Sequence, residues 1–235
     1  MYEPACPHCE TRLPFGELPK ECRQEVKLHR VFTSGLYSDA TLNGLIKDLK
    51  YKGAWRLAEP LARFAYWQLD QGGYAEVIKE KVDIIIPVPL HKNKLKRRGF
   101  NHTQKIAEHL SELLDIPLEI DALVKSKKTD SQVETGSREE REKNLAGAFA
   151  ITNTQVQPVY KTPHTGSTCV SPIFNKTVLL VDDVITTGST LRECALALRF
   201  PYKCANAKHK TCELGSRCYM KQYVREVWGL TVAKD

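Results

Sequence analysis

The sequence has no long apolar run and no secretory signal. The isoleucines at 84–86 are soon followed by Pro87, whereas a membrane-spanning helix needs about 18 or more consecutive apolar residues. The first residues lack the basic start and the apolar segment that mark a signal peptide. We therefore expect no membrane partner and a cytoplasmic location.

Two common nucleotide-binding motifs are also missing. The chain has no Walker loop ending in Gly-Lys-Ser or Gly-Lys-Thr, and it has no Gly-x-Gly-x-x-Gly fingerprint. ATP sites and dinucleotide sites of those types are therefore excluded.

The composition that is present suits a folded core. Of the 235 residues, 42% are hydrophobic, and the formal net charge is +7. Disordered chains contain fewer apolar residues and carry a larger charge imbalance. The length predicts one domain with an appendage. The mild positive charge would suit a polyanionic partner without specifying one.

Predicted strands and helices alternate along the chain. Short apolar runs predict buried strands at 83–88, 178–181 and 227–232. Helical spacing of apolar residues begins near Ser38, Asn101 and Ser189. Such alternation is typical of an α/β fold with a mainly parallel sheet flanked by helices.

Two units of unequal size are expected. Residues 1–35 contain many prolines and no helical apolar period, so we predict a small zinc-ribbon-like module that something other than a core holds together. Residues 36–235 form the larger domain, with loop insertions at about 153–176 and 200–224. Three cysteines in the second insertion fit no standard metal-binding spacing, and we interpret it as a loop.

Cysteines near the N-terminus have the spacing of metal ligands. Cys6 and Cys9 form a Cys-x-x-Cys pair, and Cys22 follows. In a reducing compartment, clustered cysteines more often bind metal than pair as disulfides. We therefore predict a structural zinc site on these three thiolates, or a degenerate remnant of one. The fourth ligand is left open between His8, Glu25 and His29.

The most informative segment runs from Val178 to Thr190. It reads as a buried strand, an acidic pair at its end, a hydroxyl-rich turn and a helix start. Ligands bind at this end of the strands in α/β sheets, and the first N–H groups of a helix attract anions. The expected phosphate-binding residues are Thr186, Thr187, Gly188, Ser189 and Thr190. Asp182 and Asp183 would repel a phosphate, but they could hold the hydroxyls of a ribose whose 5′-phosphate lies in the turn.

That arrangement resembles the 5-phosphoribosyl-1-pyrophosphate (PRPP) motif of type I phosphoribosyltransferases. Beyond the motif, the chain is similar to one branch of that superfamily, the ComF/GntX family. Four landmarks appear in the family's order, together with a cysteine-bearing leader. The landmarks are residues 45–53, Pro87–His91, Arg97–Asn101 and 132–149.

The resemblance implies further site residues. Arg98, Gly99 and Asn101 stand where pyrophosphate is contacted, with Asn101 also capping the next helix. Arg138 and Arg141 fall in the flexible loop that closes over PRPP, although the same segment would also suit a charge-laced helix. Family members commonly have glutamine where this chain has His102. That change alters the chemistry if the residue touches ligand, and matters little if it only begins a helix.

The resemblance leaves three functional hypotheses. The first is a PRPP-binding protein of DNA uptake or nucleotide-linked metabolism. If active, it would be a glycosyltransferase that displaces pyrophosphate from ribose with Mg²⁺ neutralising the leaving group. The acceptor is not readable from the sequence. The second is a PRPP-sensing regulator without turnover.

The third hypothesis is a non-catalytic competence factor that binds single-stranded DNA and a helicase-like ATPase. Basic stretches at 92–98, 125–128 and 203–225 would then follow a nucleic-acid backbone. Binding of that kind depends steeply on salt. The sequence shows no basic run interleaved with aromatic residues, so base stacking has no support in the linear pattern.

Overall fold

Four parallel strands form the central sheet, in the order β1-β8-β7-β2. The computed structural model describes residues 4–127, 143–152, 157–158, 169–170, 173, 175–199 and 224–235. The strands are β1 (Arg30–Thr33), β2 (Ile84–Pro87), β7 (Thr177–Ile185) and β8 (Glu226–Lys234). The prediction of a mainly parallel sheet is confirmed, and the three strands expected from apolar runs are among its members.

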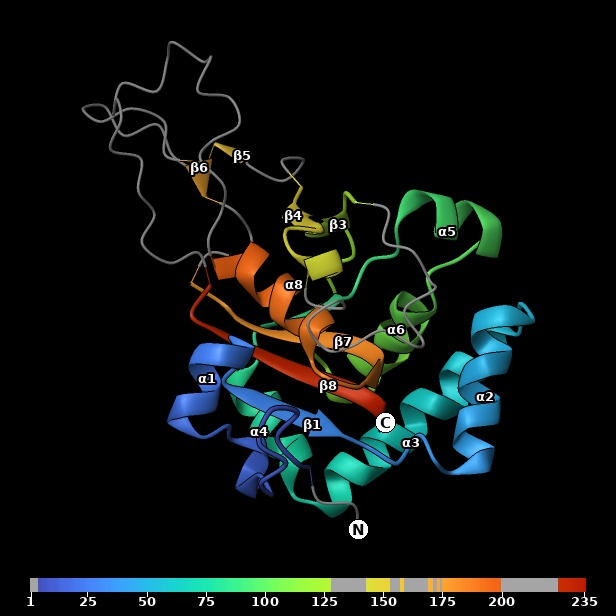
Figure 1. The fold of residues 1–235 in the computed structure, drawn as a ribbon, viewed down its shortest axis with the longest axis horizontal. Coiled ribbons are helices and arrows are strands. Elements are labelled where there is room, and N and C mark those ends of the chain that lie inside the picture. The colour runs from blue at the N-terminus through green and yellow to red at the C-terminus, as the bar shows by residue number, and fades with distance from the viewer. Residues whose placement is uncertain are drawn as a thin grey trace.

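Helices cover both faces of this sheet (Figure 1). On one face pack α1 (Lys20–Val26), α8 (Ser189–Arg199) and the antiparallel pair β3 (Leu123–Lys125) and β4 (Phe149–Ile151). On the other face pack α2 (Ala40–Tyr51), α3 (Ala58–Gln71), α4 (Tyr74–Lys81) and α6 (His102–Leu114). Because both faces of the sheet are buried, its strands can be apolar without alternation. β7 shows this, since every residue from Thr177 to Asp183 is buried.

The remaining elements are short. They are η1 (Pro14–Gly16), η2 (Trp55–Leu57), α5 (Lys92–Arg98), and the antiparallel pair β5 (Gln157–Pro158) and β6 (Cys169–Val170). The basic stretch at 92–98 forms the helix α5. Its first turn is capped by His91, whose Nδ1 accepts a hydrogen bond from the amide of Asn93 at 3.2 Å, and it ends at Gly99, which has φ +82°.

The N-terminal segment packs more closely than the sequence suggested. Leu13, Leu18 and Leu28 are at most 2% exposed and belong to the same core cluster as the inner residues of the sheet. β1, which lies inside the range 1–35, is an edge strand of that sheet. The expectation that no core holds this segment was therefore wrong, because these leucines, together with the buried Cys22 and Val26 of α1, belong to the core on one face of the sheet. The boundary at residue 35 stays a prediction.

No helix among the described ranges is long and apolar enough to cross a bilayer.

Candidate functional site

A cavity of about 520 Å³ lies at the carboxyl end of β7. This volume is in the range of small-molecule sites. Its wall is formed by the end of β7 and the first residues of α8 (182–191), by Lys47 and Lys50 of α2, and by Tyr37, Asn144, Leu145 and Asp235. All seven residues predicted from the acidic pair and the hydroxyl turn (residues 186–190) therefore line one cavity.

The hydroxyl turn has the geometry of an anion site. Gly188 has φ +76°, a conformation that glycine adopts without strain, and α8 begins at the next residue. The hydroxyls of Thr187 and Ser189 lie 2.7 Å apart. Because the first N–H groups of an α-helix have no partner within the helix, the start of α8 can donate to an anion that lies in the cavity.

The two acidic residues have different surroundings, because successive residues of a strand point to opposite faces. Asp182 lies on the face covered by α8, where its charge acts to raise the pKa of Lys125 and of Cys194. Burial and the neighbouring Asp183 raise the pKa of Asp182 to about 7. Its Oδ1 accepts a hydrogen bond from the amide of Asp183 at 3.0 Å.

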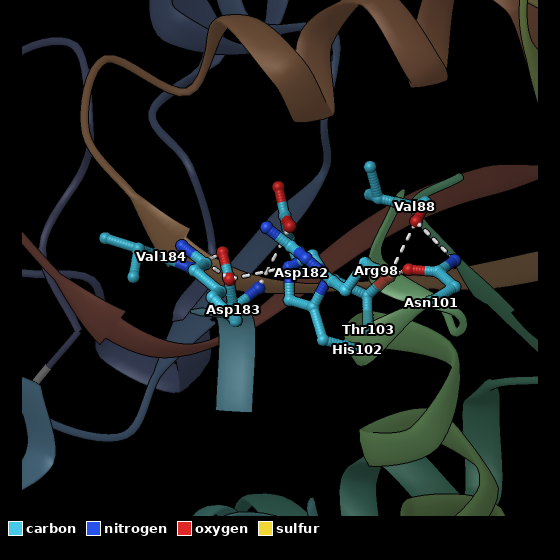
Figure 2. A network of polar contacts seen from close by, with 9 residues as sticks. Val88, Arg98, Asn101, His102, Thr103, Asp182, Asp183 and Val184 are labelled. Carbon is cyan, nitrogen blue, oxygen red and sulfur yellow. Dashed lines mark hydrogen bonds and ion pairs between the residues drawn. The ribbon is translucent and has the colours of Figure 1, made fainter. Parts of the chain in front are cut away.

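Asp183 lies on the opposite face, where two basic side chains hold it (Figure 2). Its Oδ2 is 2.6 Å from Nζ of Lys50 and 2.8 Å from Nε2 of His102. Burial alone would raise the pKa of Asp183, but these partners outweigh burial and hold the pKa well below its usual range. For Lys50, burial would lower the pKa, and the charge of Asp183 reverses that effect and raises it.

His102 continues this chain of contacts to Arg98. Nη1 of Arg98 lies 2.7 Å from Nδ1 of His102. A guanidinium can only donate, so Nδ1 is the acceptor and Nε2 carries the proton that it donates to Asp183. Burial lowers the pKa of His102, which fits this neutral tautomer. His102 is therefore the first residue of α6, and it also supports Asp183, a contact that neither interpretation of the sequence included.

The turn between α5 and α6 is attached to the end of β2. Nδ2 of Asn101 donates to the carbonyl of Val88 at 3.1 Å, and the hydroxyl of Thr103 lies 2.6 Å from the same oxygen (Figure 2). Asn101 precedes α6, but its side chain makes no capping hydrogen bond. The expectation that Asn101 caps the helix was therefore wrong in its detail, because the amide is used to fix the turn to the sheet.

Two lysines of the cavity were missed as site residues. Lys47 and Lys50 lie in the family landmark 45–53, and that landmark was the only signal in the sequence. Arg138 and Arg141 fall outside the described residues. The described segment that follows them is held to α8, since Oε2 of Glu193 accepts a hydrogen bond from the amide of Gly147 at 2.9 Å.

The three N-terminal cysteines come together as the sequence predicted. The sulfur atoms of Cys6, Cys9 and Cys22 all lie within 4.8 Å of one another. The amide of His8 donates to Sγ of Cys6 at 3.4 Å, in a tight turn that begins at Cys6. Among the described residues, no fourth cysteine, histidine or carboxylate completes this group. The ring of His29 lies 3.0 Å from Nη2 of Arg199.

This cysteine turn touches the hydroxyl turn. A methyl group added at Gly188 would lie 3.3 Å from Cγ of Pro7, between the first two cysteines. The leader therefore packs directly behind the cavity.

Comparison with known proteins identifies the class. A family model of the phosphoribosyl transferase domain matches residues 60–200, which is more than half of the chain. The chain belongs to this family. It is 31% identical to Competence protein F of Haemophilus influenzae, over 83% of this chain and 79% of that protein. The DNA utilization protein YhgH is 27% identical in Escherichia coli K12 and 28% identical in Shigella flexneri, over 82% of this chain and 77% of each relative. These similarities confirm the ComF branch of the type I phosphoribosyltransferase superfamily.

The two aspartates are expected to affect stability in opposite directions. The pKa of Asp182 is raised from 3.8 to about 7. The ligand-free fold therefore loses stability as the pH rises from about 4 to about 7, because Asp182 must ionise in a buried position. Asp182→Asn should therefore stabilise the protein at pH 8 by at most about 4 kcal/mol, at about 1.4 kcal/mol per pKa unit, and the gain should vanish toward pH 4.

Asp183→Asn should destabilise the protein at pH 8 by about 3–5 kcal/mol, because the buried Lys50 loses its partner. The pKa of Asp183 is lowered in the folded state. The stabilisation of the wild type relative to Asp183→Asn is therefore lost as the pH falls below about 4. Urea unfolding at pH 3, pH 4.5 and pH 8 measures both effects. Equal effects of the two substitutions at pH 8 would contradict the separation of the acidic pair.

Proposed function

We propose that this chain binds PRPP in the cytoplasm, in the cavity at the end of β7. One observation supports the proposal: three features line the same cavity of about 520 Å³. They are the N-terminus of a helix, a turn in which Gly188 has a positive φ, and a buried acidic pair. The hydroxyl turn (residues 186–190) would hold the 5′-phosphate. Asp182 would accept hydrogen bonds from the ribose, since fewer of its acceptor positions are engaged than those of Asp183.

The pyrophosphate would lie toward the turn between α5 and α6. Arg98 uses one guanidinium nitrogen on His102 and keeps other donors for an anion. Gly99 and Asn101 fix the shape of this turn. Arg138 and Arg141 are proposed to reach the pyrophosphate from the flexible loop, on the strength of the family resemblance.

The carboxylates of this site suit Mg²⁺. Magnesium prefers oxygen ligands and commonly takes one or two carboxylates together with phosphate oxygens of the ligand. Asp182 would supply such an oxygen, and the bound ion would neutralise charge on the leaving pyrophosphate. A raised pKa of about 7 makes Asp182 sensitive to a nearby cation, which would favour its ionised form.

The same site would serve turnover or sensing. In a transfer reaction, an acceptor attacks the anomeric carbon of ribose and pyrophosphate leaves, which makes the protein a glycosyltransferase. In a sensor, PRPP binds and stays intact. Release of pyrophosphate in the presence of candidate acceptors separates these two outcomes.

Calorimetric titration with PRPP and Mg²⁺ tests the binding proposal. We expect the wild type to bind and Asp182→Asn to lose at least about tenfold in affinity, since a hydrogen bond to a charged group contributes about 1.5–3 kcal/mol. Because this substitution should also stabilise the ligand-free fold, unfolding cannot explain a loss. If the folded wild type does not bind PRPP, the proposal is refuted.

The three N-terminal thiolates are proposed to hold a structural zinc ion. Their sulfur atoms lie within 4.8 Å of one another, and sulfur ligands of this spacing suit tetrahedral zinc. A bound ion would fix the cysteine turn, and with it Pro7 behind Gly188.

Metal analysis and thermal unfolding test the zinc proposal. We expect Cys22→Ser to reduce the zinc content and a strong chelator to lower the unfolding temperature of the wild type by about 5 °C or more. Cys194→Ala is the control, since this thiol is buried in α8 outside the group. Equal zinc content in both variants would refute the assignment.

A second candidate function, binding of single-stranded DNA, is favoured by a surface that the linear sequence did not reveal. At the junction of α2 and η2, Tyr51 is 66% exposed and Trp55 is 51% exposed. Arg98 lies over the ring of Tyr51 at 5.5 Å, and Arg56 lies over the ring of Trp55 at 5.3 Å. Aromatic rings beside cations are the recognition elements for unpaired bases.

The names of the relatives agree with this second candidate, since they refer to competence and to DNA utilization. The aromatic surface adds base stacking to the backbone contacts that the basic stretches would make. A helicase-like ATPase as partner stays a prediction.

Anisotropy titration with a labelled oligothymidylate tests this surface. Tyr51→Ala with Trp55→Ala should weaken binding about tenfold or more, because stacking contributes about 1–3 kcal/mol per base. Trp67→Ala is a matched control, since this tryptophan is also 52% exposed but lies on α3. The same affinity in both variants would argue against stacking at α2.

A further inference from the structure

Lys50 is turned inward from α2 toward the cavity. Its side chain is only 19% exposed, and its Nζ lies 2.6 Å from Oδ2 of Asp183. Two residues later, Lys52 is 72% exposed and pairs with Asp48 on the surface of the helix. Burying an ammonium group costs free energy, so a lysine near the end of a helix normally extends toward water. The inward position of Lys50 therefore needs a reason beyond the stability of α2.

The carboxylate of Asp183 is already well supplied with donors. Its Oδ1 accepts a hydrogen bond from the amide of Val184 at 2.7 Å. Its Oδ2 contacts both Lys50 and His102. A carboxylate has about four acceptor positions, so three of them are engaged before any ligand arrives. A sugar hydroxyl would have to displace a charged partner to bind here.

The ammonium group of Lys50, in contrast, has spare donors and lines the cavity. It can donate three hydrogen bonds, and one goes to Asp183. Lys47 lines the same cavity from one turn earlier in α2, so two positive groups line the space that the hydroxyl turn also lines. Lys50 also shares Asp183 with His102, which leads to Arg98. These contacts lead from Lys50 toward the turn between α5 and α6, although Arg98, Gly99 and Asn101 do not themselves line the cavity.

We propose that Lys50 is a ligand-binding cation of this site and that Asp183 is the positioning residue that holds it. The inference rests on the proposed binding of PRPP, and it names the group that meets the anionic end opposite the 5′-phosphate. In this arrangement Asp182 alone holds the ribose. Asp183 fixes the ammonium of Lys50, and His102 and Arg98 fix Asp183.

This arrangement has a consequence for metal dependence. An acidic pair without a resident cation would repel pyrophosphate until Mg²⁺ neutralises it. With Lys50 on Asp183, part of that charge is already neutralised. Binding of PRPP should then persist, more weakly, when Mg²⁺ is removed, and this residual binding should depend on Lys50.

Calorimetric titration of two ligands tests the role of Lys50. PRPP and ribose 5-phosphate share the 5′-phosphate, and only PRPP carries the pyrophosphate. Each is titrated in Mg²⁺ and in EDTA against the wild type, Lys50→Gln and the control Lys52→Gln. Glutamine at 50 keeps a donor for Asp183 and removes the charge.

We expect Lys50→Gln to weaken PRPP binding about tenfold or more, as loss of a charge-assisted hydrogen bond predicts, and to weaken ribose 5-phosphate binding less than about threefold. In EDTA, its PRPP binding should disappear while that of the wild type remains. Lys52→Gln should behave as the wild type in every arm.

The possible failures are distinguishable. If the folded wild type binds neither ligand, the proposed function fails and this inference fails with it. Two outcomes would overturn only the role of Lys50 when the wild type binds PRPP. In the first, Lys50→Gln binds each ligand with the affinity of the wild type. In the second, its affinities for PRPP and for ribose 5-phosphate fall by the same factor.

Should Lys50→Gln not fold, Lys50→Arg replaces it, because arginine keeps the pair with Asp183. Its planar guanidinium is larger than the ammonium and directs its donors differently, so it does not reproduce the contacts of lysine in a site shaped for a compact charge. The same selective loss for PRPP is therefore expected of it, and equal affinity for PRPP would overturn the proposal.

Discussion

The buried charge of Asp183 determines how several elements of this fold meet. An isolated carboxylate cannot stay ionised in the interior at low cost, so the structure must bring a positive group and a hydrogen-bond donor to it. Lys50 comes from α2 and His102 from the start of α6, and both reach the end of β7. Arg98 then holds the ring of His102 from the end of α5. One charge thereby joins α2, the consecutive helices α5 and α6, and β7, which are three separate regions of the sequence.

The alternation of side chains along β7 divides the acidic pair into two roles. Asp183 points to the face where the cations lie and stays ionised, because its partners outweigh burial. Asp182 points to the other face, where burial dominates and raises its pKa to about 7. Two identical residues thus differ in protonation through one step of the strand. Asp182 therefore titrates near neutral pH in the ligand-free fold, where a nearby cation would favour its ionised form.

Much of the fold was predictable, because each strand of β2, β7 and β8 is a short apolar run and the motif at 178–190 fixes a strand, a turn and a helix. The residues that line the cavity from this motif were predictable for the same reason. Lys50 was not, since nothing in a helical pattern indicates which lysine turns inward. Nor was the packing of the leader, whose apolar residues follow the surface of the sheet and no regular period.

The cavity at the end of β7 and the aromatic surface are not independent in this structure. Arg98 contacts His102 behind the acidic pair and also lies over the exposed ring of Tyr51. Lys50 and Tyr51 are neighbours at the end of α2, one turned to the cavity and one to the surface. A ligand that binds Lys50 or Arg98 would therefore contact either the residue next to Tyr51 in α2 or the guanidinium that lies over the ring of Tyr51. Binding in the cavity and binding at the rings would be coupled through two adjacent residues of one helix and one guanidinium, and such coupling is reciprocal.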